Sequence, residues 1–250
     1  FVDLDFALVG PVVRDASASF DRYWNFQAAF PIAVLSPEKV TDAALERLRG
    51  TLAQALEDAK RGAYADLLRR DDAVTRLVSG DWPMTWSSDY RFVADDPAKI
   101  DTHPDSSNSD VLKTLAPVLR SAQRDLTIIS PYFVPRDAGT KRLVETAQSG
   151  TRVRVLTNSL AANDVAAVHG GYAQYRDKLL EGGVQLWELK PLPGMETQSS
   201  LFGSGGASLH TKGLAVDGTT IFVGSYNLDP RSTSLNCEQG VIVQNDLLAQ

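Results

Sequence analysis

The chain has 250 residues, of which 43% are hydrophobic, so it can bury the core of one large domain or two small ones. Its net charge is −6, which argues against a generally basic nucleic-acid binder, although an acidic protein can still carry a local basic groove. Cys237 is the only cysteine, so no internal disulfide can form. No apolar run approaches the roughly 18 to 20 residues of a membrane-spanning helix, because Pro31 interrupts the stretch from Phe26 to Leu35.

The first part of the chain predicts a strand, a helix and a charged helical arm. Residues 1–9 alternate as a strand does, and the next segment, Val12 to Asn25, has a helical period. We expect this helix to bury the face formed by Val13, Ala16, Phe20 and Trp24. Residues 37–78 are helical and charged, and their arginines, from Arg47 to Arg76, are read as a solvated face or, alternatively, as a dock for anionic lipid. An apolar stripe on this arm consists of Leu45, Leu48, Leu52, Ala55 and Leu56.

From Asp89 onward the pattern alternates between strands and helices. This order predicts an α/β domain whose mixed sheet is covered by helices on both faces. The expected strands are Tyr90–Ala94, Leu126–Ser130, Val153–Thr157, Val184–Leu189, Leu209–Val216, Thr220–Ser225 and Glu238–Gln244. The expected helices between them are Val111–Arg120, Lys141–Gln148 and Asp164–Leu180.

Both ends of the chain suggest an internal piece of a longer protein. Phe1 lies within an alternating pattern, and the residues before Gln250 resemble the opening of a helix. The segments that begin at Asp3 and at Glu238 are also alike, since each is an acidic residue that opens a short strand. We therefore expect two homologous halves, with the tail of the first half and nearly all of the second in this chain.

The chemistry-bearing pattern is His210-Thr211-Lys212, Asp217 and then Gly224-Ser225-Tyr226-Asn227. Side chains alternate along a strand, so His210 and Lys212 are expected on one face, and the Asp-Gly turn folds the next strand back beside them. An imidazole can attack phosphorus or move a proton, while a lysine and polar side chains bind the phosphate oxygens. This group needs no metal or cofactor. We expect Lys212, Ser225 and Asn227 to bind phosphate and Glu238 to orient the imidazole.

The pattern H-x-K-x4-D-x6-G-S-x-N resembles the phospholipase D superfamily. Ser130–Pro135, Asn163 to Val165 with His169, and Asn227–Ser232 resemble bacterial cardiolipin synthase-like members across roughly the whole chain. The resemblance implies two similar α/β halves, each with one H-K-D set. By this resemblance residues 1–35 are the tail of the first repeat, residues 36–88 a helical linking segment and residues 89–250 the second repeat.

The resemblance also implies a partner for this half-site. Only one H-K-D set is present, so the other is expected upstream in the same chain or in a second protomer. The family mechanism passes through a covalent phosphohistidine, and we favour His210 as the general acid and base rather than the nucleophile. Asp217 is either catalytic or serves the backbone of its turn.

Three further residues are candidates for the substrate pocket. His169, Tyr132 and Arg231 are expected there by the resemblance, although each also has a plain structural reading as a core or surface residue. His103 precedes Pro104 in a polar loop and is read as solvated.

The sequence therefore predicts an enzyme of phosphatidyl transfer, peripheral on the cytoplasmic face of the bacterial inner membrane or cytoplasmic. Its partner would be a phospholipid, with nucleic acid not expected. The alternatives are hydrolysis of the same phosphodiester bond, a nuclease, or an inactive binding half of the same superfamily.

Overall fold

The computed structural model describes residues 3–36, 40–82, 84–102, 108–163, 165–190 and 209–249. His103 and Asp164 lie outside these ranges. The chain divides into two compact units, residues 1–26 with 87–250 and residues 27–86. The assignment of segments to two repeats stays a prediction.

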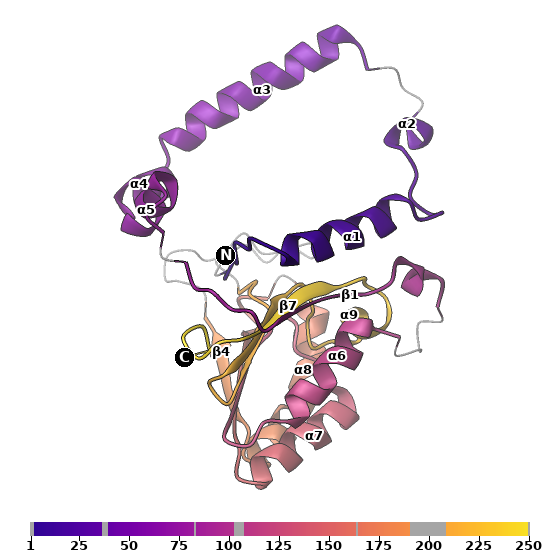
Figure 1. The fold of residues 1–250 in the computed structure, drawn as a ribbon, viewed down its shortest axis with the longest axis vertical. Helices are drawn as coiled ribbons and strands as arrows, with labels where there is room; N and C mark the ends of the chain where they lie inside the picture. The colour runs from indigo at the N-terminus through magenta and orange to yellow at the C-terminus, as the bar shows by residue number, and fades with distance from the viewer. Residues whose placement is uncertain are drawn as a thin grey trace. The chain divides into compact units, whose positions relative to one another are not determined.

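A seven-stranded mixed sheet forms the centre of the first unit in the part of the chain that is described (Figure 1). The strand order is β1-β7-β6-β5-β2-β3-β4. The pairs β2–β3 and β3–β4 are parallel and the other four pairs are antiparallel, which confirms the predicted mixed sheet. The strands are β1 (Tyr90–Ala94), β2 (Asp125–Ile129), β3 (Arg152–Asn158), β4 (Gln185–Leu189), β5 (Gly213–Val216), β6 (Thr220–Gly224) and β7 (Gln239–Gln244).

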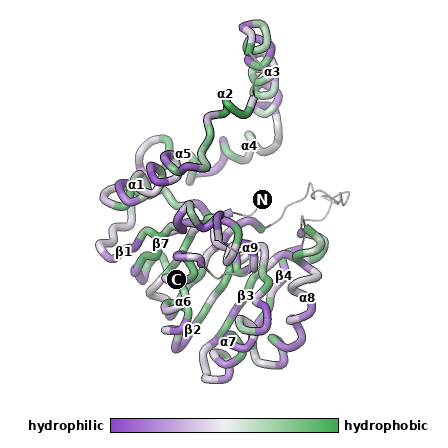
Figure 2. Tube along the Cα trace, turned by 90° about the vertical axis from the view of Figure 1, so that its right-hand side faces the viewer, coloured by the Kyte–Doolittle hydropathy of each residue, from purple (hydrophilic) through white to green (hydrophobic). Residues whose placement is uncertain are grey.

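The main core lies between this sheet and three helices, α6 (Asp110–Arg120), α7 (Arg136–Gln148) and α8 (Ala166–Glu181). Figure 2 colours much of β2 and β3 as hydrophobic, as expected for strands covered by helices. Their side chains Ile128 and Val155 are fully buried and pair in register. The short helix α9 (Pro230–Ser234) lies between β6 and β7, and a 3₁₀ helix η1 (Pro97–Asp101) follows β1.

The second face of the sheet is covered in part by the N-terminal residues. Val12, the first residue of α1 (Val12–Trp24), packs against Ile221, Val241 and Val243, and Phe6 lies against the same cluster. Helices therefore contribute to both faces, as predicted.

Two predictions for the N-terminal residues are wrong. Residues 3–9 form no strand, since they lie along the second face of the sheet without pairing to it. Helix α1 buries Val12 and Ser19 instead of the predicted apolar face, which leaves Phe20 60% and Trp24 71% exposed, with their rings stacked at 5.6 Å. The contact between α1 and β1 determines which face of the helix is buried. The hydrophobic period alone predicted burial of the neighbouring face.

The second unit is helical, as predicted for the arm. It contains α2 (Ile32–Leu35), α3 (Asp42–Lys60), α4 (Ala63–Arg70) and α5 (Asp72–Ser79). Thr41 caps α3, since its hydroxyl accepts a hydrogen bond from the amide of Ala44. Exposed ion pairs such as Arg49–Glu46 and Arg69–Asp66 support the solvated reading of the arginines. No described helix is long and apolar enough to cross a bilayer.

Candidate active site

The hairpin of β5 and β6 carries the H-K-D residues. The turn between the strands places Asp217 and Gly218 at φ of 54° and 67°, the left-handed geometry of a tight hairpin turn. Strand β5 begins at Gly213, four residues later than predicted, and Leu209 is held by a separate contact described below. Thr211 is buried while His210 is exposed and Lys212 is half-buried, so the expected alternation of side chains is present.

His210 and Lys212 line one hollow of about 550 Å³ at the open end of this hairpin. Residues of the segment from Asp3 to Leu8 and of strands β1, β6 and β7 also line the hollow. Its lining residues are Asp3, Leu4, Asp5, Phe6, Leu8, Phe92, His210, Lys212, Val223, Gly224, Ser225, Gln239, Gly240 and Val241. A reacting group here would be reached from solvent, because the imidazole side chain is 58% exposed.

The carboxylate of Asp3 contacts the imidazole of His210, with 2.9 Å between Oδ2 and Nδ1. Partial burial acts to raise the pKa of Asp3, but the hydrogen bond from His210, the amide of Leu4 and the positive charge of Lys212 together lower it. Asp3 is therefore ionised near neutral pH and can only accept a hydrogen bond. Nδ1 of His210 then carries the hydrogen, which leaves Nε2 as the nitrogen that can exchange a proton with a substrate.

Glu238 does not occupy the place predicted for it. It is 5% exposed, and its two carboxylate oxygens accept hydrogen bonds from the hydroxyls of Ser225 at 2.5 Å and Ser232 at 2.6 Å. The expectation that Glu238 orients the imidazole of His210 is corrected, because Nδ1 is paired with Asp3 and the two carboxylate oxygens of Glu238 accept from Ser225 and Ser232. The sequence comparison had matched Asp3 with Glu238 but had not indicated that Asp3 reaches this histidine.

Only some of the residues predicted to bind phosphate line the hollow. Lys212 lines the hollow, and its ammonium also donates to the carbonyl of His210 at 2.6 Å. The hydroxyl of Ser225 lies at the hollow and donates to Glu238 at 2.5 Å, and its role in binding phosphate stays a prediction. Asn227 is 6% exposed and is not among the lining residues, and its Oδ1 has no hydrogen-bond partner among the residues described.

Asp217 lies at the other end of the hairpin. Its carboxylate accepts from the backbone amides of Gln123, Arg124 and Asp125, at 2.8 to 3.2 Å. Burial acts to raise its pKa, but these amides and the charge of Arg124 lower it. These contacts favour the backbone role over the catalytic one, because they fix the chain where it enters β2.

His169, Tyr132 and Arg231 do not line the hollow. His169 lies on α8 with its ring edge-on to Tyr172 at 5.7 Å, and its buried Nδ1 has no hydrogen-bond partner among the described residues. Tyr132 is half-buried beside the fully buried Phe133, and Arg231 is exposed on α9. Their role in a substrate pocket stays a prediction.

Asn158 was not singled out from the sequence, yet it holds the residue before His210. It is 2% exposed at the end of β3, its Nδ2 donates to the carbonyl of Leu209 at 3.1 Å, and its Oδ1 accepts from the amide of Leu209 at 2.9 Å. The side-chain amide replaces a strand partner for one residue. The one available signal was an amide directly after the predicted strand Val153–Thr157.

A family model described as the phospholipase D-like domain of cardiolipin synthase matches residues 115–250. The chain belongs to this phospholipase D-like family. A relative in Escherichia coli K12 named cardiolipin synthase C is 39% identical over all of this chain and 53% of its own length. An uncharacterised protein of Helicobacter pylori is 29% identical over all of this chain and 49% of its own length. This phospholipase D-like chain thus spans about half the length of the curated relatives it matches.

Solved structures of the superfamily are also similar. The phospholipase D family member Nuc of Salmonella typhimurium is 19% identical, with a TM-score of 0.45 over 64% of this chain and 88% of Nuc.

Proposed function

We propose that the protein carrying this chain transfers a phosphatidyl group from a phospholipid to an alcohol through a covalent phosphohistidine. The observation that carries the proposal is the imidazole of His210, fixed by Asp3 at Nδ1 and placed beside Lys212 in one hollow. Family membership and the 39% identity to a protein named cardiolipin synthase C support a phospholipid as the donor.

In the proposed reaction His210 moves protons. The histidine of a second H-K-D set, in the same chain or a second protomer, attacks phosphorus, and the bond from phosphorus to the leaving oxygen breaks. Nε2 of His210 gives its proton to that oxygen. The acceptor alcohol then attacks the phosphohistidine and gives its proton to His210 as the phosphorus–nitrogen bond breaks. Nδ1 of His210 keeps its own hydrogen throughout and donates it to the carboxylate of Asp3.

The non-bridging oxygens of the phosphate need positive charge and donors as negative charge builds on them. Lys212 supplies the charge from the same side of the strand as His210. Asn227 is proposed as a further donor, reached when substrate enters the site. We propose that the protein works as a peripheral protein at the surface of the membrane that holds its phospholipid substrate.

The experiment is to trap the adduct. The intact protein, its His210→Ala variant and a His103→Ala control are incubated with labelled phosphatidylglycerol, quenched, and mapped by mass spectrometry. The expected adduct lies on a histidine other than His210. Turnover is lost in His210→Ala and kept in His103→Ala, because only the first histidine moves the proton.

Three outcomes would change this proposal. An adduct on His210 itself would make His210 the nucleophile and reverse the assigned roles. The absence of both adduct and lipid turnover would reject phosphatidyl transfer, and cleavage of a single-stranded DNA oligonucleotide by the same sample would then identify a nuclease. Release of phosphatidic acid as the only labelled lipid product, with no phosphatidyl group transferred to an alcohol, would identify hydrolysis.

A further inference from the structure

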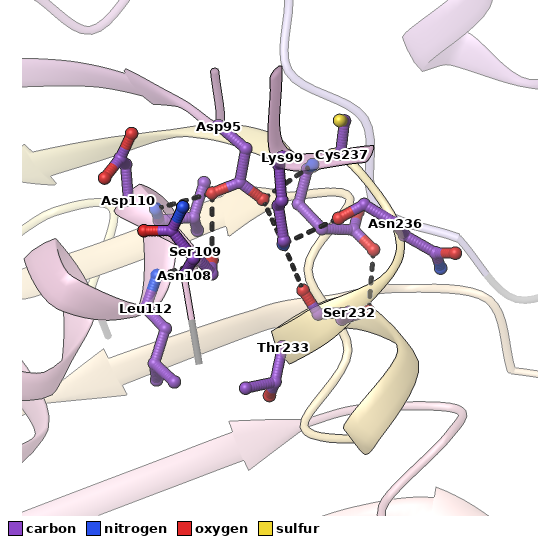
Figure 3. A network of polar contacts seen from close by, with 12 residues as sticks. Asp95, Lys99, Asn108, Ser109, Asp110, Leu112, Ser232, Thr233, Asn236 and Cys237 are labelled. Carbon is purple, nitrogen blue, oxygen red and sulfur yellow. Dashed lines mark hydrogen bonds and ion pairs between the residues drawn. The ribbon is translucent and has the colours of Figure 1, made fainter. Parts of the chain in front are cut away.

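A buried ion pair lies next to the candidate site but outside its hollow. Lys99 in η1 and Asp95 before it have side chains that are 1% and 0% exposed, with 2.7 Å between Nζ and Oδ2 (Figure 3). Removing two charges from water is costly, and an apolar pair of the same size often gives equal or greater stability. The pair therefore invites an explanation other than stability.

The ammonium of Lys99 donates three hydrogen bonds to its buried surroundings. Besides Asp95, it donates to the backbone carbonyl of Ser232 at 2.8 Å and to that of Asn236 at 2.7 Å (Figure 3). An ammonium has three hydrogens, so each has a partner. The two carbonyls bracket residues 232–236, which run from α9 into the loop before β7.

The carboxylate of Asp95 is equally occupied. Its Oδ1 accepts from the hydroxyl of Ser109 at 2.9 Å and the amide of Val111 at 3.0 Å, which ties it to the start of α6. Its Oδ2 accepts from the amide of Glu238 at 3.0 Å as well as from Lys99. The pair thus holds residues 232–236 and the amide of Glu238 against the start of α6.

Residues 232–236 are linked to the candidate site by the hydroxyl of Ser232. Ser232 is fully buried, its Oγ donates to Glu238 at 2.6 Å and accepts from the amide of Asn227 at 3.1 Å. Glu238 in turn accepts from Ser225, which lines the hollow beside His210. A chain of contacts therefore connects the ion pair to the backbone of Asn227, the residue whose side chain is proposed to bind phosphate.

We propose that Lys99, together with Asp95, is a positioning residue that sets the place of Asn227 and Glu238 through Ser232. The proposal rests on the proposed function only for its effect on turnover. A hydrocarbon pair could fill the same space, but it could not fix the two carbonyls of the loop. The charge is retained for the geometry of this loop.

Amide hydrogen exchange tests the positioning without reference to any reaction. In Lys99→Met of the intact protein, the amides of Asn227 and Gln239 exchange faster, because they donate to the hydroxyls of Ser232 and Ser225. The amides of the β2–β3 pair keep their protection. Unchanged exchange at Asn227 and Gln239 would overturn the proposal.

Turnover is the second readout. In Lys99→Met, kcat for phosphatidylglycerol falls about 10- to 100-fold with little change in KM, as expected when a supporting contact of a site is lost. Lys113→Met, which removes a lysine from an exposed pair with Asp110, leaves kcat unchanged. Leu143→Ala, a cavity in the distant α7, serves as the control for lowered stability.

Several results would count against the proposal. An equal loss of kcat in Leu143→Ala at a matched fall in Tm would mean that Lys99 acts only through stability. If Lys99→Met does not fold, Ser232→Ala keeps the ion pair and removes the linking hydroxyl, and it must then show the same faster exchange. Absence of turnover in the unmodified protein would reject the proposed function, while the exchange result would still decide the role of Lys99.

Discussion

The two sides of the candidate site are built in opposite ways. On the hairpin side, His210 and Asp3 meet as an exposed pair, with side chains 58% and 38% exposed. On the loop side, Glu238 and Ser232 are buried, and each carboxylate oxygen and hydroxyl has a close partner. Exposed pairs contribute little to stability, whereas buried polar groups are costly to leave unpaired. The difference separates the residues proposed to serve the reaction from the residues that stabilise the fold around them.

The largest expected effect on stability comes from Asn158, which lies behind the hairpin side. Asn158→Leu leaves the amide and the carbonyl of Leu209 without partners, and each such group costs about 1–3 kcal/mol. Chemical denaturation should show this loss as a lower midpoint. Thr157→Val, which removes a single 3.3 Å hydrogen bond to Pro131, is the control and should lose less. An equal loss of stability in the two variants would mean that the two hydrogen bonds to Leu209 contribute no more than the single bond to Pro131.

Asp3→Asn is expected to change activity and leave stability almost intact. The amide can no longer take the Nδ1 hydrogen as a charged acceptor, so kcat falls about 10- to 100-fold. The free energy of unfolding changes by less than about 0.5 kcal/mol, because the pair is exposed. Asp5→Asn, at a neighbouring carboxylate that lines the same hollow, is the matched control for activity. A large loss of stability in Asp3→Asn would mean that the exposed pair also stabilises the fold, as the buried groups on the loop side do.

The smallest expected effect is at Asp217, and it depends on pH. The folded state lowers the pKa of this carboxyl from its ordinary value of 3.8, so the charged form stabilises the fold at pH values above about 4. Asp217→Asn should therefore cost about 1 kcal/mol at pH 7, and the difference should shrink as the pH falls through the lowered pKa. Denaturation curves at pH 7 and pH 3 test this, with the exposed Asp246→Asn as a control. A difference that stayed constant with pH would exclude the charge as its cause.

The sequence predicted the sheet because its strands are short, apolar and separated by clear turn signals. The Asp217-Gly218 turn and the spacing from His210 to Lys212 follow from rules that act over a few residues, and both were confirmed. The contact between Asp3 and His210 joins residues 207 positions apart, and no local rule predicts such a contact. The sequence therefore placed His210, Lys212 and Ser225 together, as the hollow does, but it did not predict that Asp3 pairs with His210.

The same limit explains the errors in the N-terminal residues and in the loop. The period of α1 indicated a helix correctly, yet the buried face depended on contact with β1. Glu238 was expected at the imidazole because the sequence could not show two serine hydroxyls converging on its carboxylate. Lys99 looked like any charged residue after a strand, and its burial became visible only in the folded unit.

Residues 27–86 leave one compact unit and return to it, since residues 1–26 and 87–250 cluster together. Closing such an excursion costs entropy that grows only with the logarithm of its length, about 0.6 kcal/mol for each doubling. Adding or deleting a turn of helix in α3 would therefore change the closure cost by far less than the loss of one buried hydrogen bond. Residues 27–86 can therefore be lengthened or shortened at little cost in stability. An insertion or deletion near His210 would instead displace residues that contact one another.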